Sequence, residues 1–450
     1  MNTKGYYIET MGCQANERDS ETLAGMLESL NYVPSEKKAA QVIIVNTCSV
    51  RDNADKRFFG VLGQIKKIKE ARKDTIVCVC GCMMQQQHII DEVKQSYGWV
   101  DLVFGTHTID QFPELIKNVS EQHHHVVSVL DDVASITEGL PSKRQFKHKA
   151  FVNIMTGCNN FCTYCIVPFT RGREKSREVD AIVTEVKALV ADGVKEITLL
   201  GQNVNSYEFG FVDLLKRLND MDDLYRIRFM TSHPKDISDE LIDAYTTLEK
   251  LHPYLHLPVQ SGSSRILDLM NRGYTKEDYL RHIERLRAKV PGIGLSTDFI
   301  VGFPTETEED FDETLDLIEK VKYDSAFTFI YSKRKGTPAD SYEEQIDEEV
   351  KHERFNRMVD LLNQYSREKN ETYIGQTVEV LCDGVSKTND ALYSGRTKDG
   401  KLINFSVGVG DDDGSLPTSA EIDAGSVLNV LVTEATTFSL KGCVQELLDE

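Results

Sequence analysis

The chain has 450 residues and a formal net charge of −20, with 28% charged and 40% hydrophobic residues. A chain of this length is too long for one ordinary core and predicts two to four domains. The negative charge excludes a protein that coats nucleic acid non-specifically. The first residues lack the pattern of a signal peptide, and no apolar run approaches the roughly 20 residues that span a bilayer. We therefore expect a cytoplasmic protein, in which ten cysteines serve metal binding or catalysis.

Residues 1–120 alternate apolar strands with amphipathic helices, which predicts a doubly wound α/β domain with a parallel sheet covered on both faces. Cys13, Cys48 and Cys82 each come just past the end of a predicted strand, in the contexts GCQAN, NTCSV and GCMMQ. The carboxyl ends of parallel strands line one crevice. We therefore expect these three cysteines to meet, although they lie far apart in the sequence.

Residues 121–147 form a polar linker that contains His123, His124 and His125. These histidines could bind a metal, but a polar tract of this kind favours solvated loop residues. Two basic stretches, in residues 51–73 and 142–179, lie beside cysteines. They are either solvated helix faces or contacts to an anionic partner.

Residues 148–373 contain six apolar runs, which begin near residues 150, 196, 225, 254, 294 and 325, with helical patterns between them. Polar residues or glycines follow almost every run, at the position where a β/α barrel keeps its catalytic groups. Eight strands typically need about 250 residues, so this shorter span predicts an open, partial (β/α)6 barrel.

Residues 374–441 contain short strand patterns joined by turns, which predict a small β-barrel. Small barrels often bind RNA or single strands. Acidic residues outnumber basic ones here, which weakens that interpretation and leaves a purely structural cap as the alternative.

The stretch TGCNNFCTYC contains Cys158, Cys162 and Cys165 in the order C-x3-C-x2-C, without a fourth cysteine nearby. A closed zinc or iron–sulfur site needs four protein ligands. His148 could complete a Cys3His zinc site. Alternatively, the cysteines hold a [4Fe–4S] cluster through three irons and leave the fourth iron free for the amine and carboxylate of a substrate.

This cysteine spacing after the first strand of a partial barrel resembles the radical S-adenosylmethionine (SAM) superfamily, in which the open iron binds SAM. The resemblance implies that Tyr164 contacts the adenine and that Gln202 and Asn203 lie near the SAM amino group. It also places four residues at later strand ends close to the ribose and adenine: Gln260, Ser261, Asp298 and Gly302.

The contexts of Cys13, Cys48 and Cys82, together with YSGRTKDGKLINF in the TRAM-like C-terminal barrel, resemble the methylthiotransferases over almost the whole chain. The resemblance implies that these cysteines hold an auxiliary [4Fe–4S] cluster, again with one open iron. Cys80 is a possible rival of Cys82, which stands at the exit of its strand. We expect no side chain to act as a general base.

The family's reaction would use one SAM to generate a radical that abstracts hydrogen from an unactivated C–H bond. The auxiliary cluster would supply sulfur, a second SAM the methyl group, and a reducing partner the electrons. Three substrates are open: isopentenyladenosine beside the anticodon of tRNA, threonylcarbamoyladenosine in tRNA, and an aspartate of a ribosomal protein.

The stretches CIVPFTRGREKSRE, FMTSHPKD and GCQAN resemble the first of these groups, so the C2–H bond of isopentenyladenosine is the expected target. The protein is expected to act as a monomer without a membrane partner. A non-catalytic zinc or iron–sulfur protein that binds RNA is the alternative from another class.

Overall fold

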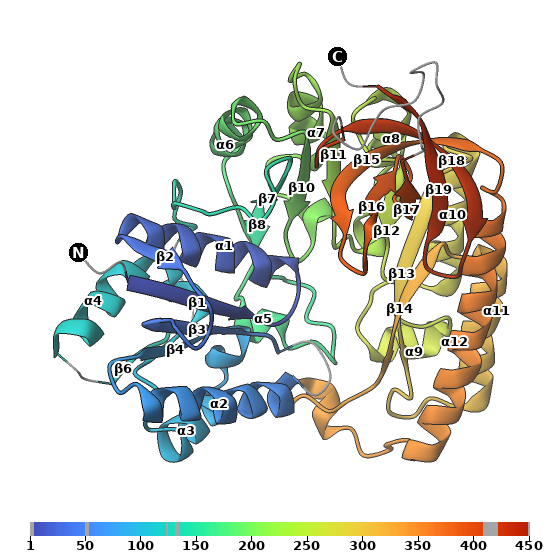
Figure 1. Ribbon diagram of the computed structural model, residues 1–450. Coiled ribbons are helices and arrows are strands. Elements are labelled where there is room, and N and C mark those ends of the chain that lie inside the picture. The colour runs from blue at the N-terminus through green and yellow to red at the C-terminus, as the bar shows by residue number, and fades with distance from the viewer. Residues whose placement is uncertain (1–3, 50–53, 123–124, 131–134, 408–421, 449–450) are drawn as a thin grey trace.

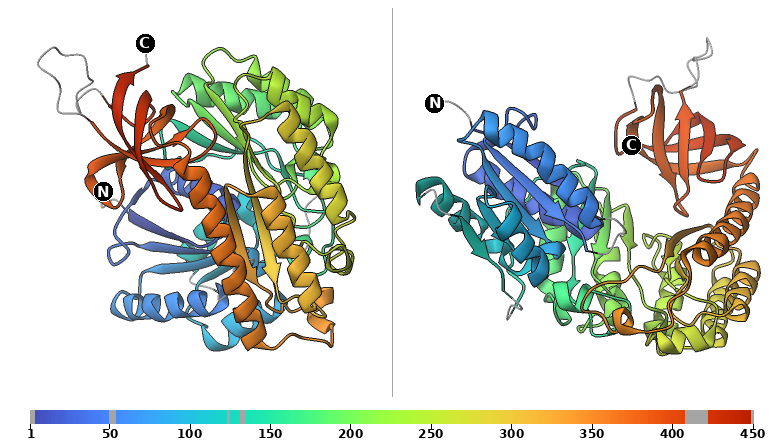
Figure 2. Two further views of the ribbon diagram at one scale, coloured as in Figure 1. Left: turned by 90° about the vertical axis from the view of Figure 1, so that its right-hand side faces the viewer. Right: turned by 90° about the horizontal axis from the view of Figure 1, so that it is seen from below.

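The computed structural model describes residues 4–49, 54–122, 125–130, 135–407 and 422–448, which fold into three parts that follow one another along the chain (Figures 1 and 2). None of the helices in these ranges combines the length and apolar character that a membrane-spanning segment requires. His123 and His124 lie outside the described residues. His125 is exposed, and its Nδ1 lies 2.7 Å from the carbonyl oxygen of Val100.

The N-terminal part is a parallel sheet in the order β2-β1-β3-β4-β5-β6. Successive residues of a strand point to opposite faces, and the strands are apolar on both faces because helices cover both, as predicted. Val42 and Ile44 pack with α1 and α4, whereas Ile43 and Val45 pack with α2 and α3. The elements are β1 (Lys4–Thr10), α1 (Gln14–Ser29), β2 (Tyr32–Pro34), β3 (Val42–Thr47), α2 (Ala54–Ala71), β4 (Ile76–Gly81), η1 (Cys82–Gln85), α3 (Gln87–Ser96), β5 (Leu102–Phe104), η2 (Thr106–Gln111), α4 (Phe112–Gln122) and β6 (Val126–Ser128).

The central part is the expected open barrel of six parallel strands, split into two sheets with the orders β11-β10-β7 and β12-β13-β14. Among the described residues, one isolated bridge connects the two sheets, between Ile227 of β11 and Leu251 just before β12. In the described part of the chain β7 and β14 do not pair, so the barrel stays open on that side. The strands are β7 (Lys149–Asn153), β10 (Glu196–Leu200), β11 (Arg226–Phe229), β12 (Tyr254–His256), β13 (Gly294–Val301) and β14 (Ser325–Ile330).

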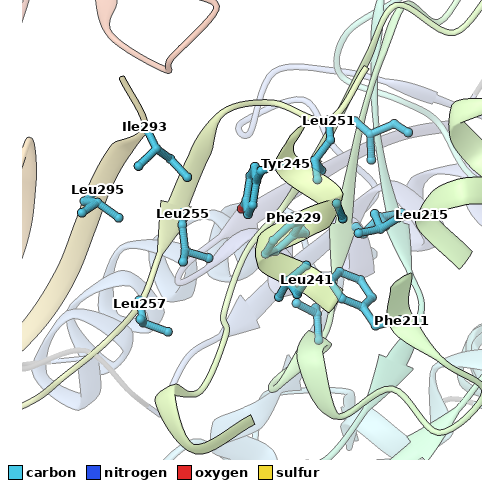
Figure 3. Close-up of a cluster of buried hydrophobic side chains, with 14 of the residues drawn as sticks. Phe211, Leu215, Phe229, Leu241, Tyr245, Leu251, Leu255, Leu257, Ile293 and Leu295 are labelled. Atoms are coloured by element: carbon cyan, nitrogen blue, oxygen red, sulfur yellow. The ribbon is translucent and has the colours of Figure 1, made fainter. Parts of the chain in front are cut away.

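Helices cover the outside of this open barrel, and the cysteine loop lies beside a small ribbon of β8 (Met155–Thr156) and β9 (Lys175–Ser176). The apolar core lies between strands and helices, where the rings of Phe211 and Phe229 meet edge to face at 5.0 Å (Figure 3). The remaining elements are α5 (Val167–Thr170), α6 (Val179–Ala191), η3 (Val204–Ser206), α7 (Phe211–Asn219), η4 (Pro234–Asp236), α8 (Asp239–Thr247), α9 (Ser264–Leu269), α10 (Lys276–Lys289), α11 (Glu308–Val321), η5 (Pro338–Ser341) and α12 (Glu348–Glu371).

The C-terminal part is a closed barrel in the order β15-β16-β17-β19-β18. Four strands fall in the predicted segments, whereas β19 extends beyond residue 441, where we expected the domain to end. Leu440 and Val444 of this strand are buried between polar residues, and β19 closes the barrel by pairing with both β17 and β18. The strands are β15 (Thr377–Ser386), β16 (Asn389–Thr397), β17 (Leu402–Ser406), β18 (Val427–Ala435) and β19 (Leu440–Leu447).

Charged side chains dock the C-terminal barrel on the amino ends of β7, β10 and β11. Lys149 and His148 both contact the carboxylate of Asp383, and Lys149 also lies 3.5 Å from Glu196. Burial opposes ionisation of Glu196, but Arg228 and Lys149 hold its pKa below the ordinary value. His148 therefore belongs to this docking network and is not placed as a fourth ligand of the Cys158 loop.

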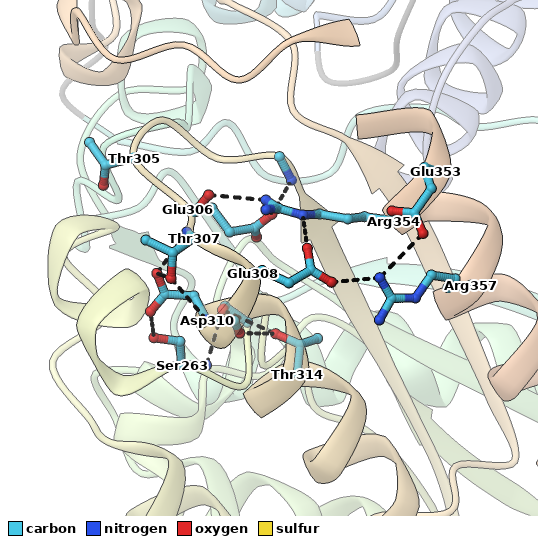
Figure 4. A network of polar contacts seen from close by, with 12 residues as sticks. Ser263, Thr305, Glu306, Thr307, Glu308, Asp310, Thr314, Glu353, Arg354 and Arg357 are labelled. Atoms are coloured by element: carbon cyan, nitrogen blue, oxygen red, sulfur yellow. Dashed lines mark hydrogen bonds and ion pairs between the residues drawn. The ribbon is translucent and has the colours of Figure 1, made fainter. Parts of the chain in front are cut away.

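A second polar network ties the loop after β13 to α11 and α12 (Figure 4). Thr307 caps α11 by accepting a hydrogen bond from the amide of Asp310, whose carboxylate accepts one from the amide of Thr307. The carboxylate of Glu306 accepts hydrogen bonds from the Gly302 amide at 2.8 Å and from Arg354 at 3.0 Å. Burial nevertheless raises the pKa of Glu306 to about 7.

We expect Glu306 to make the protein less stable as the pH rises towards 7. The unfolded chain releases this proton near pH 4.5, whereas the folded chain keeps it until about pH 7, so the folded state loses stability between these values. The unfolding free energy of E306Q should therefore rise by up to about 3 kcal/mol relative to that of the wild type across this window. Urea unfolding at several pH values measures this difference. E308Q is the control. Because Arg357 lowers the pKa of Glu308, the unfolding free energy of E308Q should not rise relative to the wild type as the pH increases. A gap between E306Q and the wild type that does not change with pH would contradict the prediction.

Gly262 allows the loop after β12 to contact the backbone of α11. A Cβ at this position would lie 2.4 Å from the Glu313 carbonyl oxygen and from the Thr314 Cα. We expect G262A to cost about 1–3 kcal/mol of unfolding free energy. G63A, in α2 with no atom of the described residues within 4 Å of its Cβ, should instead stabilise the protein by about 0.5–1 kcal/mol. Equal melting temperatures of the two variants would contradict this expectation.

Candidate functional site

The three N-terminal cysteines meet at the carboxyl ends of β1, β3 and β4, as the strand pattern predicts. The Sγ atoms of Cys13 and Cys82 lie 3.7 and 3.9 Å from the same atom, Oδ1 of Asn16. Gly12, at φ +122°, brings the Cys13 loop so close to Cys48 that a Cβ on Gly12 would lie 3.1 Å from the Cys48 Sγ. Residues from three separate strands thus line one small volume.

The side chain of Asn16 holds this arrangement together. Its Nδ2 donates to the carbonyl oxygens of Met11 at 2.9 Å and Thr47 at 2.6 Å, the residues that lead into the loops of Cys13 and Cys48. Asn46 in turn donates to the Asn16 carbonyl oxygen at 2.9 Å. Asn16 is completely buried, and buried amides of this kind fix geometry because leaving them unpaired is costly.

Cys80, the possible rival of Cys82, points elsewhere. It is buried in the apolar core that β4 shares with α1 and α4, and burial raises the pKa of its thiol well above the ordinary value. Cys82 instead begins η1 at the strand's exit. The geometry therefore favours Cys82 as the partner of Cys13 and Cys48, and this ligand set stays a prediction.

The barrel cysteines form a second group in the loop between β8 and α5. The amide of Gly157, at φ +78°, donates to the Gln202 side chain at 2.7 Å and begins the turn that carries Cys158. Burial raises the pKa of the Cys158 thiol to about 11 and that of Cys165 to about 12, and the nearby Cys162 raises both further. Buried neighbouring thiols of this kind lose their protons when a metal binds them.

Two arginines that the sequence pattern did not single out for these roles contact the two groups. Arg272 follows α9 and donates to the Cys162 Sγ at 3.4 Å and to the Tyr164 hydroxyl at 3.4 Å. Arg171 follows α5 and donates from Nε to the Cys82 Sγ at 3.3 Å. Arg171 belongs to the basic stretch 142–179, which we expected to be solvated or to contact an anionic partner. The structure instead leaves this arginine only 8% exposed.

Three predicted SAM contacts lie near the barrel cysteines or at the same strand ends. Gln202 holds the cysteine loop through Gly157. Asn203 donates to Asp236 at 2.8 Å, and its buried Oδ1 has no hydrogen-bond partner among the described residues. The Tyr164 hydroxyl accepts a hydrogen bond from the same Arg272 nitrogen that contacts the Cys162 Sγ.

Gln260 and Asp298 lie together, but Asp298 stands inside β13 and not at its end, where we expected it. The loop after β12 runs back beside β13, and the Gln260 amide donates to the Asp298 carbonyl oxygen at 2.9 Å. Gln260 has φ +77°, and its side chain hydrogen-bonds Asp298, whose carboxylate also lies 3.4 Å from His256 Nε2. Burial raises the pKa of Asp298, although His256 and Arg272 oppose the rise. A strained backbone and a partly buried carboxylate with a raised pKa at one place are typical of functional sites.

Ser261 and Gly302 face helices. The Ser261 hydroxyl lies 3.5 Å from that of Thr314 on α11, and a Cβ on Gly302 would lie 2.4 Å from the Cγ of Lys351 on α12. Any contact of these two residues with SAM would have to come from their backbone.

The structure fits clusters better than zinc. Within the described ranges no group of three or more histidine, cysteine, aspartate or glutamate side chains is arranged to hold a single metal ion. A cluster binds each thiolate to a different iron atom, so its cysteines need not converge on one point. In the predicted ligand sets each cluster would receive three cysteines, and one of its irons would be without a protein ligand.

Comparisons with known proteins agree with this architecture. Residues 152–318 match the radical SAM superfamily, residues 5–105 the uncharacterized protein family UPF0004, and residues 371–444 the TRAM domain. Among solved structures, the radical SAM methyltransferase TsrM of Kitasatospora setae aligns with 76% of this chain and 74% of its own, at a TM-score of 0.56 and 16% identity. The cobalamin-dependent radical SAM enzyme OxsB aligns with 81% of this chain and 61% of its own, at 0.52 and 14%. These two likenesses concern the fold alone.

The open barrel with its three-cysteine loop is thus that of a radical SAM enzyme. Relatives named tRNA-2-methylthio-N(6)-dimethylallyladenosine synthase are similar over nearly the full length. The relative from Alkaliphilus oremlandii is 52% identical over 98% of this chain and 92% of its own, and that from Clostridioides difficile is 51% identical over 97% and 90%. The chain belongs to this family of radical SAM methylthiotransferases. Membership confirms the predicted enzyme class and the cofactors, SAM and [4Fe–4S] clusters, and rules out the alternative of a non-catalytic zinc or iron–sulfur protein.

We expect N16A to lose the auxiliary cluster, because Asn16 orders the loops of Cys13 and Cys48. After anaerobic reconstitution the iron content should fall from about eight to about four atoms per chain, measured with acid-labile sulfide. N219A is the matched control, since Asn219 accepts a hydrogen bond from Lys250 at the end of α7 and lies outside both cysteine groups. Full iron loading of N16A would contradict this prediction.

Proposed function

We propose that this protein converts N6-isopentenyladenosine on the 3′ side of the tRNA anticodon to its 2-methylthio derivative. The observation that carries the proposal is the pair of three-cysteine groups, joined across one domain junction by Arg171. The names of the full-length relatives support the same substrate. They favour it over threonylcarbamoyladenosine and over a ribosomal aspartate.

In this proposal Cys158, Cys162 and Cys165 hold the cluster that binds SAM, and Cys13, Cys48 and Cys82 hold the auxiliary cluster. When bound, the clusters and SAM supply the one-electron chemistry, the sulfur and the methyl group, which no side chain of the chain can provide. The electrons must come from a reducing partner protein or small molecule. The task of the protein is to place the reacting groups and to exclude competing reactions.

The polar groups on and after the barrel strands are suited to hold SAM. The Oδ1 of Asn203, which has no hydrogen-bond partner in the part of the chain that the structure describes, is an acceptor for the amino group, and Tyr164 offers an aromatic face to the adenine. Asp298, oriented by Gln260 and His256, is an acceptor for ribose hydroxyls. Ser261 and Gly302 complete the proposed set through their backbone.

The surface beside the barrel cysteines is suited to an unpaired RNA loop. Phe161 and Phe169 meet edge to face at 6.1 Å, and the guanidinium of the exposed Arg173 stacks on Phe161 at 4.2 Å. Phe169 is 48% exposed. Aromatic and arginine surfaces of this kind stack the splayed bases of single-stranded RNA. An anticodon loop can therefore present one base to the site without the opening of a duplex.

The experiment that tests this function uses a synthetic anticodon stem-loop that carries isopentenyladenosine. The reconstituted enzyme, SAM, sulfide and a reductant should yield the 2-methylthio nucleoside, detected by mass spectrometry after digestion. A stem-loop with threonylcarbamoyladenosine should stay unmodified. The opposite preference would overturn the proposed substrate.

Substitution of single cysteines separates the proposed roles of the two groups. C82A should lose methylthiolation by at least about 100-fold, since loss of a residue that only hydrogen-bonds a metal ligand already costs about 10- to 100-fold and Cys82 is proposed as a ligand itself. It should still cleave SAM reductively. C158A should lose both activities. C80A is the matched control on the same strand and should keep both, because its thiol lies in the apolar core. Methylthiolation by C82A at the rate of C80A would remove Cys82 from the ligand set.

A further inference from the structure

Arg171 connects the barrel to the auxiliary cysteine group through three separate contacts. Its Nε donates to the Cys82 Sγ at 3.3 Å, and its terminal nitrogen donates to Asn16 Oδ1 at 3.1 Å and to Asp19 Oδ2 at 2.7 Å. Arg171 and Asp19 are 8% and 7% exposed. A buried guanidinium with this set of partners is strongly fixed, because all its contacts form in a medium of low dielectric constant.

Arg171 lies close in the chain to the barrel cysteines, so its contacts link the two cysteine groups. It stands six residues after Cys165, separated from that cysteine mainly by the short helix α5. The Thr170 carbonyl oxygen at the end of α5 accepts a hydrogen bond from the Thr106 hydroxyl of η2 at 2.8 Å. The loop that carries one cysteine group thus inserts a cation directly beside the other.

We propose that Arg171 is a positioning residue that sets the reduction potential of the auxiliary cluster, and that the carboxylate of Asp19 opposes its effect. The inference rests on Cys82 being a cluster ligand, as proposed above. Hydrogen bonds to the sulfur ligands and nearby positive charge favour the reduced, more negative form of a cluster and so raise its potential. Asp19 offsets part of the positive charge of Arg171.

This role differs from that of a simple clamp between two domains. A clamp would lose its effect in the same way whichever partner of the ion pair is removed. An electrostatic role predicts opposite outcomes: loss of Arg171 removes the donor and the positive charge, whereas loss of the Asp19 charge leaves the arginine uncompensated beside Cys82.

The test is a redox titration of the auxiliary cluster, followed by electron paramagnetic resonance, in a chain that lacks the barrel cluster through C158A, C162A and C165A. In this background R171M should shift the potential to a lower value and D19N to a higher one. R171K, which keeps the charge without the planar set of donors, should lie between R171M and the parent. R217M is the matched control, because Arg217 forms an exposed ion pair with Asp180 on the outside of the barrel.

Opposite shifts for R171M and D19N, with R217M at the parent value, would establish the proposal. If R171M does not retain a cluster, the proposal is tested by D19N alone, whose cluster should have a higher reduction potential than that of the parent chain. Unchanged potentials, or shifts of R171M and D19N in the same direction, would overturn it while leaving the proposed function intact. A parent chain without about four irons would instead overturn the ligand set, and the inference with it.

Discussion

The site depends on the hydrogen bonds of one buried amide, that of Asn16. Three parallel strands end at the same edge of the N-terminal sheet, but strand ends alone bring cysteines only into the same region. Asn16 bonds the segments that lead into two of the cysteine loops, and its oxygen faces the third cysteine and Arg171. The same side chain therefore orders the auxiliary site and receives the contact from the barrel.

Much of this architecture can be predicted from the sequence because it follows from short-range patterns. Apolar runs of strand length, separated by amphipathic helices, indicated both the doubly wound sheet and the six strands of the open barrel. Cysteines placed directly after strands, as Cys48 and Cys82 are, indicated the auxiliary group, since parallel strands bring their carboxyl ends together. The preference for Cys82 over Cys80 also followed from position, because Cys80 still belongs to the strand.

The charged residues of the site could not be predicted in this way. Nothing in the local pattern separates Arg171, which is buried against Asp19, from Arg173, which is exposed two residues later. Burial of an arginine depends on partners that are distant in sequence. The orientation of Ser261, whose hydroxyl faces α11, likewise depends on a distant partner. So does β19: its mixed sequence does not indicate a strand, and it closes the barrel only by pairing with β17 and β18.

The C-terminal barrel covers the amino ends of β7, β10 and β11 with ion pairs, while both cysteine groups lie at carboxyl ends of strands. The docking ion pairs and the barrel cysteines therefore occupy opposite ends of the central strands. Among the described residues, the attachment of the C-terminal barrel uses none of the side chains proposed as cluster ligands or SAM contacts, so the two sets of residues can change independently.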